Sequence, residues 1–346
     1  MKKRLDYIDI AKGIAIIYVV LSHISISFLA KHVSSFYMPF FFFLSGLVYN
    51  EKIYNNYYKL IEKKISLLKI YFSASGLLLL MYFFLNKINK NELIRVVFGI
   101  FYSRYYINKS SSISLLSISN NALWFLPSLF LVFILYFGIC KISKCKIDKV
   151  KYSVFLSIIG IVLNKCCTFL FPWNLDTSLI CTIFFCLGDV LKEKIEKRYK
   201  KYNIKEDFVI FLIMIILNLF SIKINGMINL SIGVYSNYLL FFLGASSGIG
   251  LYLIISIFIS KFIPILNRLL VYVGKQSLTI MLYHMVVINL LLIPGYYKYL
   301  NTILLYRGSL MFGLVSTFNV IVFILLVDCL KKKIFNNVKK FLNRLF

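Results

Sequence analysis

Residues 7–28 read YIDIAKGIAIIYVVLSHISISF, an apolar run that is long enough to cross a bilayer as one helix. A lysine, Lys12, and a histidine, His23, lie inside this run. They are eleven residues apart, so a helix places them within about 20° of one face and about 16 Å apart along its axis. Ionisable residues at membrane depth are costly and mark functional sites. The stretch therefore predicts a membrane protein and a first candidate site.

The neighbours of these two residues leave a second interpretation open. Asp9 lies three residues before Lys12, the spacing at which opposite charges meet on a helix. In the alternative interpretation, Lys12 extends to the lipid headgroups and His23 bonds a carbonyl of a neighbouring helix, without any function. The presence of both side chains on one helical face favours a functional site.

The composition gives the protein class. Hydrophobic residues make up 60% of the 346 residues, charged residues make up 15%, and the mean hydropathy is +0.82. These values are typical of an all-α, polytopic integral membrane protein rather than a soluble one. We expect a single membrane-embedded domain over residues 1–346, with no soluble C-terminal domain. About ten spans are expected, near residues 8–29, 36–50, 66–85, 122–140, 152–171, 178–191, 207–223, 236–260, 277–293 and 307–330.

The formal net charge of +27 reflects topology rather than nucleic-acid binding. Lysine and arginine are concentrated in alternate connections, as the positive-inside rule requires of cytoplasmic segments. The sequence therefore predicts that both termini are cytoplasmic, with attraction to anionic lipids as a secondary effect. The basic connections lie at residues 2–4, 52–64, 141–151, 192–205, 261–275 and 331–344.

Several other features indicate structural roles. The first apolar run is too long for a signal-peptide core, so we expect it to remain as the first span. The seven cysteines lack zinc-site spacing, and with only three histidines no metal site is expected. Gly46 and Gly188 are expected to permit close helix approach, and Asp189 to pair with a lysine. Residues 92–105 mix apolar and basic side chains, as an interfacial amphipathic helix does.

Four segments carry a family resemblance. In order, they are LDYIDIAKGIAIIYVVLSH at 5–23, FYMPFFFFLSG at 36–46, LWFL at 123–126 and GKQSLTIMLYH at 274–284. Together they resemble the acyltransferase-3 family of membrane-bound O-acyltransferases. The resemblance implies a multi-pass protein of the bacterial cytoplasmic (inner) membrane that uses acetyl-CoA as co-substrate. It also implies an acceptor hydroxyl on a cell-surface or exported glycan (capsule, O-antigen or exopolysaccharide), free or lipid-linked.

The resemblance also assigns expected roles to residues. The family motif pairs a basic residue, commonly arginine, with a histidine eleven positions later, and these positions are Lys12 and His23 here. Lysine keeps the charge but contacts a phosphate as a point charge, without the bidentate fork of arginine. Lys63 and Lys64 match the family's basic residues near the third span as coenzyme A phosphate contacts. Tyr37 stands where many relatives carry histidine.

The chemistry of the residues agrees with this interpretation. Transfer of an acetyl group to a hydroxyl requires a base near neutral pH, usually histidine. We expect His23 to act as the base or as a transient acetyl carrier, and Lys12 to hold phosphates. Asp9 is expected to orient Lys12. His284 either orients the acceptor, polarises the thioester carbonyl, or is a hydrogen-bonded core residue.

Two other classes of function remain open from the residues alone. A transporter or flippase of a lipid-linked glycan also carries intramembrane charge, but such carriers usually contain repeats, and the sequence shows none. A polymerase or glycosyltransferase is expected to have acidic outer loops. The outer loops here contain few acidic residues, of which Glu92 and Asp176 are the clearest.

Overall fold

The computed structural model describes residues 5–24, 34–85, 90–109, 115, 122–226, 228–291 and 310–345. All regular structure in these residues is helical, apart from two isolated β-bridges. The α-helices are α1 (Asp6–Ile24), α3 (Tyr37–Leu47), α4 (Tyr57–Leu85), α5 (Lys90–Tyr102), α6 (Phe125–Ile142), α7 (Lys146–Cys166), α8 (Leu175–Lys200), α9 (Ile204–Ile224), α10 (Tyr238–Phe262), α11 (Pro264–Lys275), α12 (Ser277–Leu291) and α14 (Leu310–Leu345).

Within the described residues, six helices are long and apolar enough to cross a membrane. They are α1, α6, α8, α9, α10 and α14. A seventh span results if α11 and α12, which meet at an angle of 75°, are counted as one broken span. The expected span near residues 36–50 is only the 11-residue helix α3. The all-helical membrane class is thus confirmed, whereas the count of about ten spans is not.

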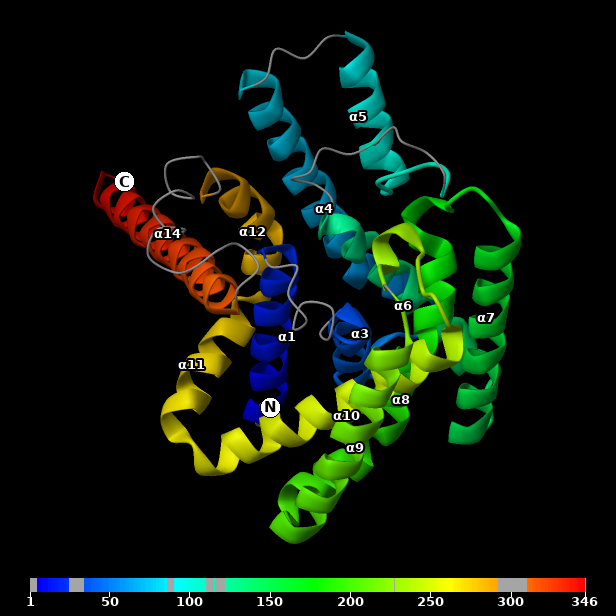
Figure 1. Cartoon of the computed structure of the whole chain (residues 1–346). Coiled ribbons are helices and arrows are strands. Elements are labelled where there is room, and N and C mark those ends of the chain that lie inside the picture. Colours follow the sequence, from blue (N-terminus) through cyan, green and yellow to red (C-terminus); the bar gives the residue numbers. More distant parts are fainter. Residues whose placement is uncertain are drawn as a thin grey trace.

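Helix α1 occupies the centre of the bundle (Figure 1) and packs against α3, α10, α11, α12 and α14. Its buried residues lie on all sides of the helix, as expected for a helix with neighbours all round. The outermost helices differ. In α9, for example, large apolar side chains such as Phe208, Ile216 and Phe220 are exposed, as on a lipid-facing surface.

Helices α3 and α8 pack at very short range through two glycines. A Cβ atom on Gly46 would lie 1.9 Å from the carbonyl oxygen of Phe185, and one on Gly188 would lie 2.1 Å from that of Phe43. No other residue fits at such distances. The predicted role of Gly46 and Gly188 in close helix approach is confirmed.

One expectation about the connecting segments is met, and one helix there was not predicted. The amphipathic helix expected over residues 92–105 is α5, whose exposed apolar face includes Ile94, Phe98 and Phe101. A helix that the sequence prediction missed is α11, which begins at Pro264 and precedes the expected span near 277–293. Figure 1 shows the two termini well apart, and the expected cytoplasmic location of both is not confirmed.

Lys149 of α7 lies between two carboxylates, and with them it links three elements of the bundle. Its Nζ atom is 3.0 Å from Glu51 and 3.4 Å from Asp189 of α8. The hydroxyl of Tyr136 on α6 donates a 2.7 Å hydrogen bond to Asp189. The predicted pairing of Asp189 with a lysine is confirmed.

A second ion pair, fully buried, joins three connecting segments. Arg104, which follows α5, pairs with Asp176 at the start of α8. Arg104 also donates from Nε to the carbonyl of Phe171 at 3.0 Å and from Nη1 to that of Ser231 at 2.8 Å. Asn164 donates to the second oxygen of Asp176 at 2.9 Å. Every branch of this arginine is therefore satisfied, as a buried charge requires.

Candidate functional site

Helix α1 carries both residues of the eleven-residue motif. Lys12 and His23 lie on the same continuous helix, so the predicted common face holds. The Lys12 side chain is 26% exposed and His23 is exposed, although most of this helix is buried. Between them on the same face, Ala15 and Val19 are buried. The two polar groups are thus accessible at two positions along α1, which we call the first level (Lys12) and the second level (His23). Buried apolar residues separate the two levels.

The first level contains the expected pair of Asp9 and Lys12. The Nζ atom of Lys12 lies 3.9 Å from a carboxylate oxygen of Asp9, which is only 1% exposed. A buried carboxylate beside the ammonium group restricts where Lys12 can point. The structure therefore brings together the pair that the i,i+3 spacing predicted, with the lysine still accessible.

Close packing of α1 against α11 sets the position of this first level. A Cβ atom on Gly274 would lie 1.8 Å from the carbonyl oxygen of Asp9, and one on Gly13 would lie 2.5 Å from that of Leu270. His23 follows Gly13 by ten residues, and His284 follows Gly274 by ten residues. The glycine contact thus fixes α1 against the last turn of α11, directly before α12 begins, and each of the two segments reaches a histidine ten residues later.

The second level is a histidine pair. The imidazole rings of His23 and His284 lie with centroids 5.3 Å apart and planes inclined by 44°. His284 is fully buried, whereas His23 is exposed. The Nδ1 atom of His284 lies 3.1 Å from the carbonyl oxygen of Ile280 and 2.9 Å from that of Met281. Two residues that the sequence named separately are therefore in contact across 261 positions of the chain.

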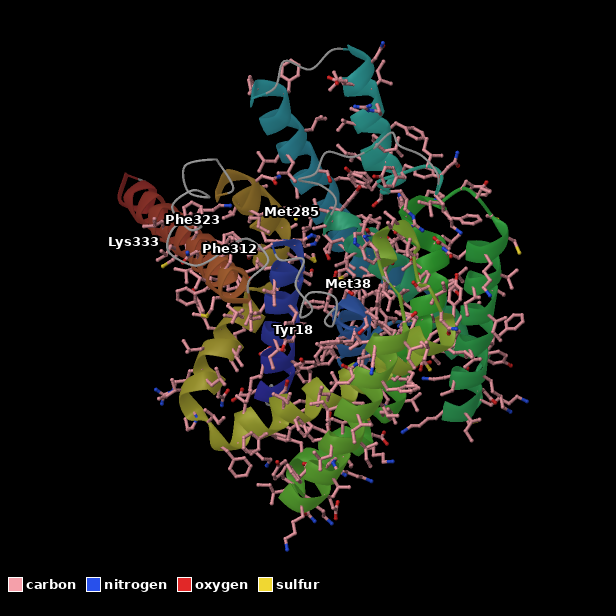
Figure 2. All side chains as sticks on the ribbon, viewed as in Figure 1. Tyr18, Met38, Met285, Phe312, Phe323 and Lys333 are labelled. Atoms are coloured by element: carbon pink, nitrogen blue, oxygen red, sulfur yellow. The ribbon has the colours of Figure 1, made fainter. Side chains whose placement is uncertain are left out.

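No role was predicted from the sequence for several other side chains near α1. The Tyr37 hydroxyl of α3 interacts with Ser22, the residue before His23. The hydroxyl of Tyr18 donates a 3.0 Å hydrogen bond to that of Tyr252 on α10. Figure 2 shows Tyr18 and Met38 in the central region of the bundle, and Met285 nearer the C-terminal end of α1. The i,i+4 spacing of Tyr18 and Ser22 is a sequence signal that these two hydroxyl groups share one face of α1.

Lys63 and Lys64 lie away from the motif, on helix α4. This helix packs chiefly against α6. The Nζ atom of Lys64 lies 3.8 Å from the centroid of the Phe133 ring, in a cation–π arrangement. Lys63 is exposed. The ammonium group of Lys64 is therefore already in contact with an aromatic ring, whereas Lys63 is exposed to solvent.

Alanine at Gly274 is expected to destabilise the protein by about 1–3 kcal/mol, because its methyl group overpacks the α1–α11 contact. Thermal unfolding of the purified protein in detergent measures the change. The matched control is Gly76→Ala, since no atom lies within 4 Å of a Cβ at Gly76. That control should be neutral or stabilising by about 0.5–1 kcal/mol. Equal effects of the two substitutions would contradict the packing argument.

Comparison with known proteins adds a family match to this geometry. The family model for an acyltransferase domain, acyltransferase-3, matches residues 5–328. The match includes both histidines of the pair, Lys12, and the glycine contact between α1 and α11. No curated protein matches the chain.

Proposed function

This chain belongs to the acyltransferase-3 family and is a membrane acyltransferase, and we propose on that basis that it is an O-acetyltransferase. The proposed donor is cytoplasmic acetyl-CoA. The proposed acceptor is a hydroxyl of a cell-surface or exported glycan, of the capsule, O-antigen or exopolysaccharide class, free or lipid-linked. The proposed location is the bacterial inner membrane, with both termini in the cytoplasm.

The observation that carries the proposal is the histidine pair inside the helical bundle. Attack of a hydroxyl on a thioester carbonyl requires removal of the hydroxyl proton as the oxygen attacks. The exposed ring of His23 takes that proton, the carbon–sulfur bond breaks, and His23 returns the proton to the leaving thiolate. A route in which His23 transiently carries the acetyl group would use the same ring nitrogen.

Lys12 supports the choice of an acyl-CoA as the donor. Coenzyme A carries its phosphates at the far end of an extended pantetheine arm from the thioester. Lys12 presents an accessible ammonium group about 16 Å along the helix axis from His23, and Asp9 holds it in place. Lys63, being exposed, is a further candidate phosphate contact, and Lys64 is a weaker one because its ammonium group already faces Phe133.

The proposal is tested by acetyl transfer in the native host. A deletion strain, with and without the restored gene, receives labelled acetyl groups, and base-labile label in its surface glycan is measured. Label that depends on the gene supports O-acetyl transfer. Label that is independent of the gene, with reduced export of glycan in the deletion strain, would instead support the flippase alternative.

Methionine at Lys12 is expected to raise the KM for acetyl-CoA about tenfold or more, with a much smaller change in kcat. The reason is the loss of a charged hydrogen bond to phosphate, worth about 1.5–3 kcal/mol. Lys12→Arg keeps the charge and should remain within a few-fold of wild type. The control is Lys200→Met, which removes an exposed lysine at the end of α8. A fall in kcat at unchanged KM would contradict the assignment.

A further inference from the structure

We propose that His284 is a positioning residue that accepts a hydrogen bond from His23 and thereby fixes which nitrogen of His23 acts as the base. The role of His23 as the base rests on the proposed function, whereas the hydrogen bond between the two histidines does not. It starts from three observations: the contact of the rings, the hydrogen bonds at Nδ1 of His284, and the state of its Nε2 atom.

The hydrogen bonds of His284 determine its tautomer. Both partners of Nδ1 are backbone carbonyl oxygens, those of Ile280 and Met281. A carbonyl oxygen only accepts, so Nδ1 must carry the proton. A neutral imidazole has one N–H group, and Nε2 therefore presents a lone pair. The backbone of α12 thus turns this ring into an acceptor that points away from its own helix.

The acceptor atom needs a partner. Nε2 of His284 is buried and has no hydrogen-bond partner among the residues that the structure describes. An unsatisfied buried acceptor costs about 1–3 kcal/mol. The rings of His23 and His284 have centroids 5.3 Å apart and planes inclined by 44°, so a rotation of the His23 ring can bring one of its nitrogens to hydrogen-bond distance from Nε2. His23 is the side chain in ring contact with His284, so an N–H group of His23 is the donor that satisfies Nε2.

This hydrogen bond has a direct consequence for the reaction. When one nitrogen of His23 donates to His284, the other carries the lone pair and faces the accessible side. That nitrogen takes the proton of the acceptor hydroxyl while the hydroxyl oxygen bonds to the acyl carbon. The imidazolium that forms stays hydrogen-bonded to His284, and it returns the proton to the thiolate after the carbon–sulfur bond breaks. His284 orients the base as a carboxylate does in a catalytic triad.

The first test measures the tautomer in the wild-type protein, without any assay of activity. The chain has only three histidines, so protein labelled with ¹⁵N-histidine in lipid bilayers gives few imidazole signals. The His284 signals are assigned by their loss in His284→Gln. The expected result is a protonated Nδ1 and an unprotonated Nε2 at His284, together with a single tautomer at His23. A protonated Nε2 at His284 would overturn the proposal.

The second test compares two variants of His284. Phenylalanine keeps a ring but removes the acceptor, whereas glutamine retains an acceptor oxygen. His284→Phe should lower kcat about 10²-fold or more with KM for acetyl-CoA within about twofold, and should give His23 a mixture of tautomers. His284→Gln should keep more activity than His284→Phe. Equal activity of both variants, with one His23 tautomer in each, would overturn the proposal even if either variant is less stable.

The two tests separate this proposal from the proposed function. Wild-type protein that shows the expected tautomers but transfers no acetyl group would reject the proposed function and the catalytic role of the pair. Wild-type protein that transfers acetyl groups with Nε2 of His284 protonated would reject the pairing alone.

Discussion

Alanine at His23 is expected to abolish measurable acetyl transfer while the protein stays in the membrane at its normal level. His23 supplies the nitrogen that removes the acceptor proton, and loss of such a base costs about 10²–10⁴-fold in rate. Removal of the side chain leaves Nε2 of His284 without its proposed donor, which costs about 1–3 kcal/mol, less than the total stability of about 5–15 kcal/mol that is typical of a folded protein. Activity and folding are therefore separable at this position.

The measurement uses membranes of a deletion strain that expresses each variant, because these membranes contain the native acceptor. Transfer of labelled acetyl groups is normalised to the amount of protein in the membrane. The matched control is Ile17→Ala, on the same helix but about 120° around its axis from His23. That control should retain activity within a few-fold. Activity of His23→Ala within tenfold of wild type would exclude His23 as the base.

Much of the candidate site was predictable from sequence, because it depends on local spacing. The face shared by Lys12 and His23 and the ion pair of Lys12 with Asp9 both follow from helical geometry. His284 stood out because histidine is rare in apolar spans. Its contact with His23 was not predictable, because the two histidines are 261 positions apart and their contact depends on how the whole intervening chain folds.

The features that the prediction missed also differ in whether a local sequence pattern could have indicated them. Helix α11 had a local signal, because Pro264 begins it and its exposed apolar residues Ile265, Leu269 and Tyr272 share one face. A search for long apolar runs does not detect such a short amphipathic helix. The partner of Arg104 had no local signal. Arg104 was assigned to the interfacial amphipathic helix and Asp176 to an outer loop, and only the folded chain buries them together.

Methionine at Arg104 is expected to lower the stability of the protein by about 3–5 kcal/mol, the largest stability effect predicted here. The substitution removes both hydrogen bonds to the carbonyls of Phe171 and Ser231 and leaves Asp176 as a buried, uncompensated carboxylate. Asp176 would keep one donor, Asn164, which supplies no charge. Thermal unfolding of the purified protein in detergent measures the loss.

A double-mutant cycle separates the charge from the rest of the network. Asp176→Asn removes the carboxylate charge at nearly constant volume, so Arg104→Met/Asp176→Asn should recover a large part of the stability that Arg104→Met loses. Additive losses in the double variant would show that the arginine stabilises the fold through its carbonyl contacts instead. No residue of this network lies on α1 or α12, so acetyl transfer per folded molecule should stay near wild type in the double variant. The histidine pair and the arginine network would then be independent, one serving the reaction and the other holding three connecting segments together.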